Sequence, residues 1–391
     1  MFPNLKRLLA VGTATAVALV SFGPAPTAQA SVSSRAVTKA AGWLVANPAT
    51  VDDGISGEIA AATALAVARR NAPTMRARIA ALEAKAATGV DGKPGAAASL
   101  AILVKAVHLN PKSFGGANLV EKLLAGIDPT TGQVGAFGSA YGQALAIIAL
   151  KRANQPVPAA VVTKLLSFQD ATGAFGYEFN GFNPDPDSTA LSIQALHLLR
   201  GHSTEVKEAI KWAKNTQTSQ GYWAVPFGSP VDSTALMASA LKLVHRSSGK
   251  AAGWLRTQQL RDGGFAAELR TSTSTSNLLA TSTATYLLTG KSMATFTYPL
   301  KGYTKSPRPK ISGTTRVGNI LTAKVGTWSP APTAKTYRWL RSGKAIAGAT
   351  SATYTLTSAD LGRRIRIKVT VGGIGLKTAT ELSKATRSIR P

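Results

Sequence analysis

A helical repeat constrains the fold of this chain more than any other feature. Apolar residues recur at helical spacing from Arg35 to about Lys291, in segments that Gly, Pro and Asn interrupt. The most apolar segments are separated by 39, 44, 47, 45 and 44 residues, and they begin near Glu58, Ala97, Tyr141, Ser188, Ser233 and Asn277. A polar-faced helical segment and a Gly-containing loop precede each one. We therefore predict six helical pairs, which is enough to close a ring.

The two helices of each predicted pair differ in polarity, and this difference assigns them to layers. The second helices, such as residues 190–199, are apolar nearly all round, which suits helices buried on most sides. The first helices, such as residues 205–215, have one apolar and one Lys/Glu face. We expect an all-α α/α toroid of six helical hairpins with the second helices inside. All outer-to-inner loops then lie on one rim, where any site would form.

Three of these loops share a Gln-Gly-aromatic pattern, with a degraded copy at Asp128 and Gly132. The full copies are Gln169-Gly173-Phe175, Gln217-Gly221-Trp223 and Gln259-Gly263-Phe265. They resemble the QW motif of squalene and oxidosqualene cyclases, and so the terpenoid cyclase and protein prenyltransferase toroid superfamily, whose repeat is called the prenyltransferase and squalene oxidase repeat. We interpret the motif as scaffold, because Gly allows a positive φ and the Gln amide can bond the backbone.

The run Asp185-Pro186-Asp187-Ser188-Thr189-Ala190 carries the sharpest catalytic hypothesis. It resembles the D-x-D-D-T-A motif of class II terpene cyclases, in which the middle Asp protonates the substrate; this resemblance implies Asp187 as the acid, with Asp185 beside it. Ser188 replaces the next carboxylate, so the motif is incomplete. Asp232-Ser233-Thr234 repeats the pattern one unit later, and this recurrence favours a structural role for both acids as helix N-caps.

Other toroids suggest two further functions. Sugar-degrading α/α toroids use acid pairs in an aromatic cleft, and vertebrate cobalamin carriers bind a ligand without chemistry. We expect a ligand-contacting wall on the rim, made of Tyr177, Phe179, Phe182, Tyr222, Trp223 and Asp232. The prenyltransferase zinc site is excluded because the chain has no Cys and its four His are scattered. We expect no metal and no cofactor.

The C-terminal region changes to short β-rich runs after a Pro-containing linker. Strands are predicted at residues 320–325, 336–340, 351–356 and 364–371. Trp339 resembles the core Trp of immunoglobulin-like domains, so we expect an all-β sandwich of the small Ig-like kind found in secreted bacterial proteins. Residues 308–391 carry 16 Lys or Arg against Asp360 and Glu381. This surplus predicts attraction to an anionic cell-wall polymer or glycan, and no specific nucleic acid.

The N-terminus has the pattern of a secretory signal: Lys6 and Arg7, an apolar run, and Ala28-Gln29-Ala30 before Ser31. We predict a signal peptide at 1–30, a toroid at 31–290, a linker at 291–309 and a sandwich at 310–391. No later run is long enough for a transmembrane anchor. The mature protein is expected to be secreted, extracellular or attached to the cell surface.

Function follows less directly than fold. Because the scaffold residues are retained while the cyclase acid motif is incomplete, the sequence favours a non-catalytic binding or surface-interaction protein with a small-molecule ligand at the toroid rim. The alternative is an extracellular enzyme, acting either as a cyclase-like acid catalyst through Asp187 or on glycans through a rim acid pair.

Overall fold

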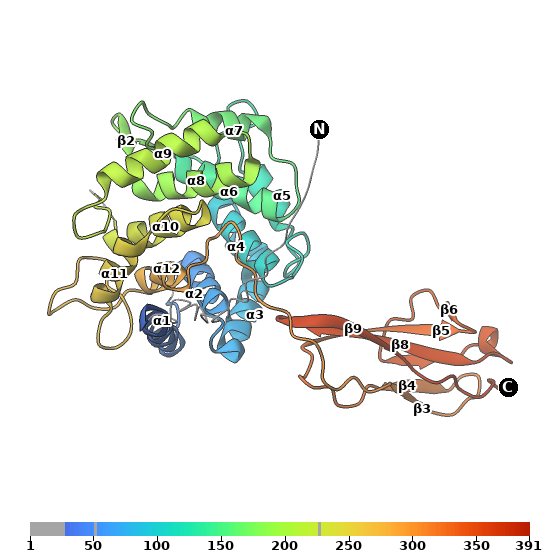
Figure 1. The fold of residues 1–391 in the computed structure, drawn as a ribbon. Coiled ribbons are helices and arrows are strands. Elements are labelled where there is room, and N and C mark those ends of the chain that lie inside the picture. Colours follow the sequence, from blue (N-terminus) through green and yellow to red (C-terminus); the bar gives the residue numbers. More distant parts are fainter. Residues whose placement is uncertain (1–27, 51–52, 226–227) are drawn as a thin grey trace, which may run out of the picture.

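The computed structural model describes residues 28–50, 53–225 and 228–391. Figure 1 shows a helical region and a smaller β region joined by one connection. The predicted signal peptide, apart from its last residues, lies outside the described part of the chain. Within the described part, no helix is both long and apolar enough to cross a membrane.

Two sets of helices alternate along the helical region. One set is apolar and buried: α2 (Gly54–Ala68), α4 (Pro94–Ala106), α6 (Ala140–Arg152), α8 (Pro186–Leu199), α10 (Pro230–Leu243) and α12 (Leu278–Thr289). The other set is α1 (Ala28–Ala46), α3 (Ala72–Gly89), α5 (Leu119–Ala125), α7 (Ala159–Leu166), α9 (Ser203–Thr216) and α11 (Gly249–Gln258). Each helix of the first set contacts the next one, and α12 contacts α2 (Figure 1).

Burial follows the predicted layers. In α4, every residue from Leu100 to Val104 is at most 1% exposed, whereas α9 buries only Ala209, Ile210 and Ala213 along one side. Helices of the second set pack on the outside of the first, α9 on α8 and α11 on α10. The apolar segments therefore line the inside, because a helix that is apolar all round is stable only where neighbours cover it.

The Gln-Gly-aromatic loops tie successive pairs together. The Gln169 Nε2 atom donates to the carbonyl oxygens of Gly173 (3.1 Å) and Glu205 (2.9 Å), the latter in α9. In the last copy, Gln259 Nε2 donates to Ala36 O (2.9 Å) in α1 and so links the two ends of the helical region. Phe175, Trp223 and Phe265 are at most 1% exposed. This geometry agrees with the scaffold interpretation of the motif.

The segment after α12 is held against the helices. Arg152 donates to the carbonyl oxygens of Met293 (3.0 Å) and Phe296 (2.6 Å), and Tyr298 N donates to Ala106 O (2.8 Å). Lys301 N then donates to Gly375 O (2.8 Å) in the β region. The predicted linker is thus packed along its first part.

The β region forms two antiparallel sheets. One has the order β3 (Lys310–Ser312), β4 (Ile320–Lys324), β7 (Thr353–Thr355); the other has β6 (Lys344–Ala345), β5 (Ala334–Arg341), β8 (Ile365–Gly373), β9 (Leu376–Leu382). Trp339 is fully buried and lies opposite Ile367 in the β5–β8 pair. All four predicted strands are present, while β3, β6 and β9 were not predicted.

Candidate functional site

The first turns of the inner helices are capped by residues other than the predicted ones. The Asp185 side chain accepts from Ser188 N (2.8 Å) at the start of α8, and Ser229 Oγ accepts from Asp232 N (3.1 Å) at the start of α10. The interpretation of Asp187 and Asp232 as N-caps is therefore wrong. Because Pro186 and Pro230 occupy the first helical positions, the caps precede them and both acids lie inside the first turn.

A shared hydrogen bond fixes how the inner helices correspond to one another. Thr189, Thr234 and Thr281 each accept, through the hydroxyl oxygen, from the backbone N–H of the aromatic loop residue, at 2.9–3.1 Å. Gln143 Oε1 does the same for Val134 N (2.6 Å) in α6. Two residues earlier, the four helices carry equivalent positions: Tyr141, Asp187, Asp232 and Leu279. These residues lie around one end of the ring.

Partial exposure distinguishes these positions from the middle turns of the inner helices. Tyr141 and Leu279 are 39% and 51% exposed, and Asp187 and Asp232 are half-buried. The positions that follow, such as Ala144 and Ala190, are fully buried. We call the group of Tyr141, Asp187, Asp232 and Leu279 the ring mouth.

Asp187 has the electrostatics of a protonated carboxylic acid. Burial, and to a smaller extent the negative charges of Asp185 and Asp232, raise its pKa from 3.8 to about 8. Its Oδ1 atom is buried and has no hydrogen-bond partner among the described residues. The Ser233 hydroxyl opposes the rise in pKa but does not reach hydrogen-bond geometry. Asp187 is therefore neutral at pH 7 and has a proton to give.

Asp232 titrates below Asp187. Burial raises its pKa to about 6, and the hydroxyls of Thr283 and Ser229 hold the increase down. The pKa of Tyr141 is also raised, first by burial and then by the charges of Asp187 and Asp232. Between about pH 6 and 8 the ring mouth thus holds one carboxylic acid and one carboxylate, the pairing that acid–base catalysis needs.

An aromatic hairpin lies beside Asp187. Strands β1 (Gly176–Glu178) and β2 (Phe182–Pro184) pair directly before the cap Asp185. Phe179 and Phe182 are 63% and 38% exposed, and the ring of Tyr177 lies 5.9 Å from that of Phe137. Phe137, 55% exposed, was not predicted. This hairpin joins the Gln-Gly-aromatic motif after α7 (Ala159–Leu166) to the start of α8.

Two of the predicted wall residues pack against outer helices. Trp223 is 1% exposed and its Nε1 donates to Ala213 O (2.8 Å), so no ligand can reach it in this structure. Tyr222 stacks on Trp254 of α11, with centroids 4.9 Å apart. The spacing of the motif could not predict these contacts, because an aromatic residue after a turn can either face a ligand at the rim or pack between two helices.

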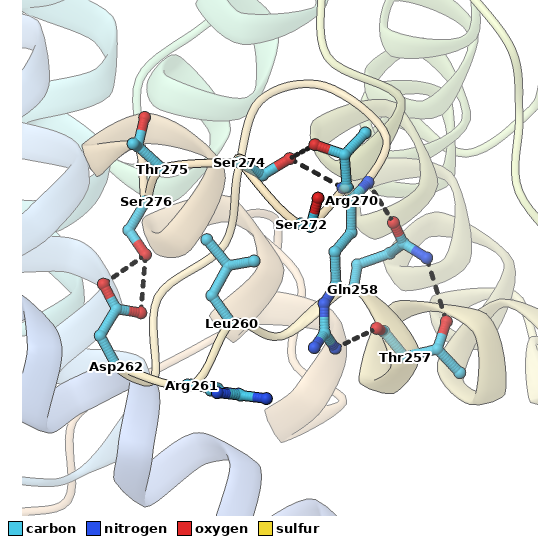
Figure 2. Close-up of a pocket in the computed structure, with 11 residues that line it drawn as sticks. Thr257, Gln258, Leu260, Arg261, Asp262, Arg270, Ser272, Ser274, Thr275 and Ser276 are labelled. Atoms are coloured by element: carbon cyan, nitrogen blue, oxygen red, sulfur yellow. Dashed lines mark hydrogen bonds between the residues drawn. The ribbon is translucent and has the colours of Figure 1, made fainter.

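The Ser/Thr-rich loop before α12 lines a hollow of about 940 Å³ (Figure 2). Its polar groups bond mainly to one another: Arg270 Nη1 donates to Thr257 O and Gln259 O, and Ser276 Oγ donates to Asp262. The loop is therefore braced by its own side chains.

A second hollow of about 550 Å³ lies at the opposite end of α8 and α10. Three of the four histidines line it, although they are scattered along the sequence. They are His197, His202 and His245. Among the described residues, no group of three or more His, Asp or Glu side chains is placed to hold a metal ion.

The raised pKa of Asp187 predicts that the stability of the protein depends on pH. Its pKa is higher in the folded chain than its ordinary value of 3.8, so the folded protein loses stability as pH rises from about 4 to about 8. We expect Asp187→Asn to raise the Tm at pH 8.5 by about 2–4 °C or more, with little change at pH 4. Differential scanning calorimetry at both pH values measures this. An equal shift at both would contradict the raised pKa.

Known proteins resemble this chain in structure only. No protein-family model and no curated sequence matches it. An inactive variant of an α-1,6-mannanase from Salegentibacter, in complex with α-1,6-mannotriose, superposes with a TM-score of 0.52 and 12% identity over 67% of this chain and 100% of its own. A possible GH105 family member from Salmonella enterica superposes with a TM-score of 0.51 and 14% sequence identity. The match covers 72% of this chain and 98% of that protein. A type II terpene cyclase from Scytonema, in complex with its product merosterolic acid A, superposes with a TM-score of 0.50 and 14% sequence identity. The match covers 67% of this chain and 97% of the cyclase.

These likenesses define the class of the helical region. It has the α/α-toroid fold that glycoside hydrolases and type II terpene cyclases share. Identities of 12–14% establish the fold alone. They give no support to the non-catalytic function that the sequence favoured.

Proposed function

We propose that the protein is an enzyme of the α/α-toroid class that cleaves glycosidic bonds, with Asp187 as the general acid and Asp232 as the base. The observation that carries the proposal is the half-buried Asp187 carboxyl, whose pKa is raised to about 8 and whose Oδ1 has no partner. A catalytic acid must keep its proton near neutral pH, which an ordinary Asp does not.

The reaction follows from the two protonation states. Asp187 gives its proton to the departing glycosidic oxygen as the bond from that oxygen to the anomeric carbon breaks. Asp232 accepts a proton from a water molecule, whose hydroxide adds to the anomeric carbon. Solvent then carries the proton from Asp232 back to Asp187. Tyr177, Phe179 and Phe182 provide apolar faces on which sugar rings can stack.

Exposure of the ring mouth favours a glycan over a polyene. Tyr141 and Leu279 remain 39% and 51% exposed, so water can approach the ring mouth from outside, while the Asp187 carboxyl itself is desolvated. Hydrolysis consumes water, whereas a carbocation formed from a polyene must be protected from it. The α-1,6-mannanase is a structure of similar fold that holds a glycan, and its inactive variant has two aspartates replaced by asparagine; those two are consecutive, whereas Asp187 and Asp232 lie on different helices.

Cyclase-like chemistry is the second candidate. The resemblance around Asp187 and the type II terpene cyclase likeness support it. Assays of purified full-length protein separate the two: release of reducing ends from α- and β-linked oligosaccharides supports the glycosidase, and cyclised product from a geranylgeranyl substrate supports the cyclase. Absence of both would leave the ligand-binding alternative, which thermal shift against the same compounds tests.

The pH dependence of the reaction is a prediction of its own. Asp232 must be ionised, which requires a pH above about 6, and Asp187 must be protonated, which requires a pH below about 8. We therefore expect a bell-shaped profile of kcat/KM with its maximum near pH 7. Initial rates from pH 4 to 10 measure it. An optimum near pH 4 would mean that neither carboxyl has the assigned role.

The remaining architecture is part of the proposal. We propose that the helical region is a closed toroid of six hairpins and that the two-sheet region is an Ig-like sandwich. Its sheet orders, β3-β4-β7 and β6-β5-β8-β9, and the buried Trp339 support the Ig-like sandwich.

We also propose that the protein is secreted after residues 1–30 are removed. The basic Lys6 and Arg7, the apolar run that follows and the small residues of Ala28-Gln29-Ala30 support this. A mature N-terminus at Ser31 in culture medium is the check.

A further inference from the structure

One face of the larger sheet in the β region is cationic and has no acidic residue. Residues alternate between the core and solvent along each strand. In β8, Ile365, Ile367, Val369 and Val371 are buried, so Arg366, Lys368 and Thr370 point outward. Their neighbours on β5 and β9 include Thr336, Arg338 and Thr380. We call these six outward residues the cationic sheet face.

The charges on this face are not neutralised within the chain. Arg338 lies directly opposite Lys368, although like charges in a cross-strand pair destabilise a sheet. Neither these side chains nor Arg366 form an ion pair with any described residue. Of the two carboxylates after residue 308, Asp360 is fully buried against Arg341, and Glu381 lies opposite Val369 on the other side of the sheet.

Hydroxyl groups lie among the cations. Thr370 and Thr380 are hydrogen-bonded to each other (2.9 Å) across β8 and β9, and Thr336 is opposite Thr370 on β5. A shallow hollow of about 650 Å³ runs over Thr336, Arg338, Lys368 and Thr370. Cations bind anionic groups and hydroxyls bond to sugar hydroxyls, so the face combines what an anionic polysaccharide requires. None of its six residues is aromatic; Tyr337, which also lines the hollow, packs against the core of the β region.

We propose that the cationic sheet face binds a linear glycopolymer with regularly spaced anionic groups. Each repeating unit presents an anion to Arg338, Lys368 or Arg366 and hydroxyls to the threonines. The face is in the β region, so it is independent of the chemistry assigned to Asp187. It holds three of the 16 Lys and Arg residues found from residue 308 onward.

The test compares two variants of the full chain with equal charge loss. One is Arg338→Gln, Arg366→Gln, Lys368→Gln; the control is Lys310→Gln, Arg316→Gln, Lys324→Gln, whose cations are exposed on or beside the smaller sheet. Titration calorimetry uses poly(glycerol phosphate), polygalacturonate and neutral dextran. The two anionic probes distinguish phosphate from carboxylate recognition. Thermal melts show whether each variant is folded.

We expect the wild type to bind at least one anionic polymer but not dextran. The face variant should lose affinity by about tenfold or more, while the control loses less than about threefold. Equal losses in both variants would reduce the effect to net charge and overturn the proposal. It would also be overturned by the absence of binding to both polymers, or by tighter binding to duplex DNA or to vesicles of anionic lipid.

Discussion

Asp187→Asn is expected to lower kcat for oligosaccharide hydrolysis by about 10²–10⁴-fold, the usual contribution of a general acid. Asparagine fits the same space but has no proton to give to the leaving oxygen. The variant should fold, because Asp185 and not Asp187 caps α8. The alkaline limb of the pH profile, which reports the loss of the Asp187 proton, should disappear as well.

Leaving-group chemistry distinguishes a lost acid from a distorted site. An aryl glycoside with an acidic phenol needs little protonation, so Asp187→Asn should retain far more activity on it than on an oligosaccharide. Glu121→Gln removes an exposed carboxylate from the outer helix α5 and is the control, with kcat within about twofold of wild type. Equal losses on both substrates would show that Asp187 only supports the structure, and full activity would exclude it from the site.

Gly173→Ala is expected to lower the free energy of unfolding by about 3 kcal/mol or more, the second large effect. The φ of Gly173 is +93°, and an added Cβ would lie 2.5 Å from the backbone carbonyl of Glu208 in α9. The methyl group therefore both strains the turn and pushes the next helical pair away. At about 2–4 °C per kcal/mol, the Tm should fall by roughly 10 °C.

Gly201→Ala is the matched control. Its φ of +80° is similar, but an added Cβ there meets no atom within 4 Å. Only the backbone strain remains, which costs about 1 kcal/mol. Urea unfolding of the two variants gives the difference that belongs to the contact with Glu208. Equal destabilisation would mean that the close approach between pairs contributes nothing.

The sequence alone determined the layers of the helical region and its repeat. Residues 190–199 are apolar nearly all round and therefore require burial on most sides. The Gly at a fixed place in four of the loops indicates a turn with positive φ, which other residues rarely adopt. These are local properties that each segment carries by itself. The same holds for the strand that contains Trp339, since alternation along a strand follows from its own residues.

The role of the two acids could not be predicted from the sequence. Recurrence of Asp-Ser-Thr before an apolar helix suggested capping, but Pro186 and Pro230 move each cap to an earlier residue. Two of the aromatic residues also differ in burial: Phe179 is exposed in the hairpin before α8, whereas Trp223 is buried against α9. The spacing of residues along the chain does not determine which residues a side chain contacts in the folded protein.

Tertiary structure decided the site because a pKa depends on surroundings that come from distant segments. Tyr141, Asp187 and Asp232 follow one another at intervals of one helical pair, and the packing of α6, α8 and α10 brings their charges within reach of one another. Local sequence determined which helices are buried. Only the packed ring determined that two of its acids are desolvated together, and so that one of them keeps its proton.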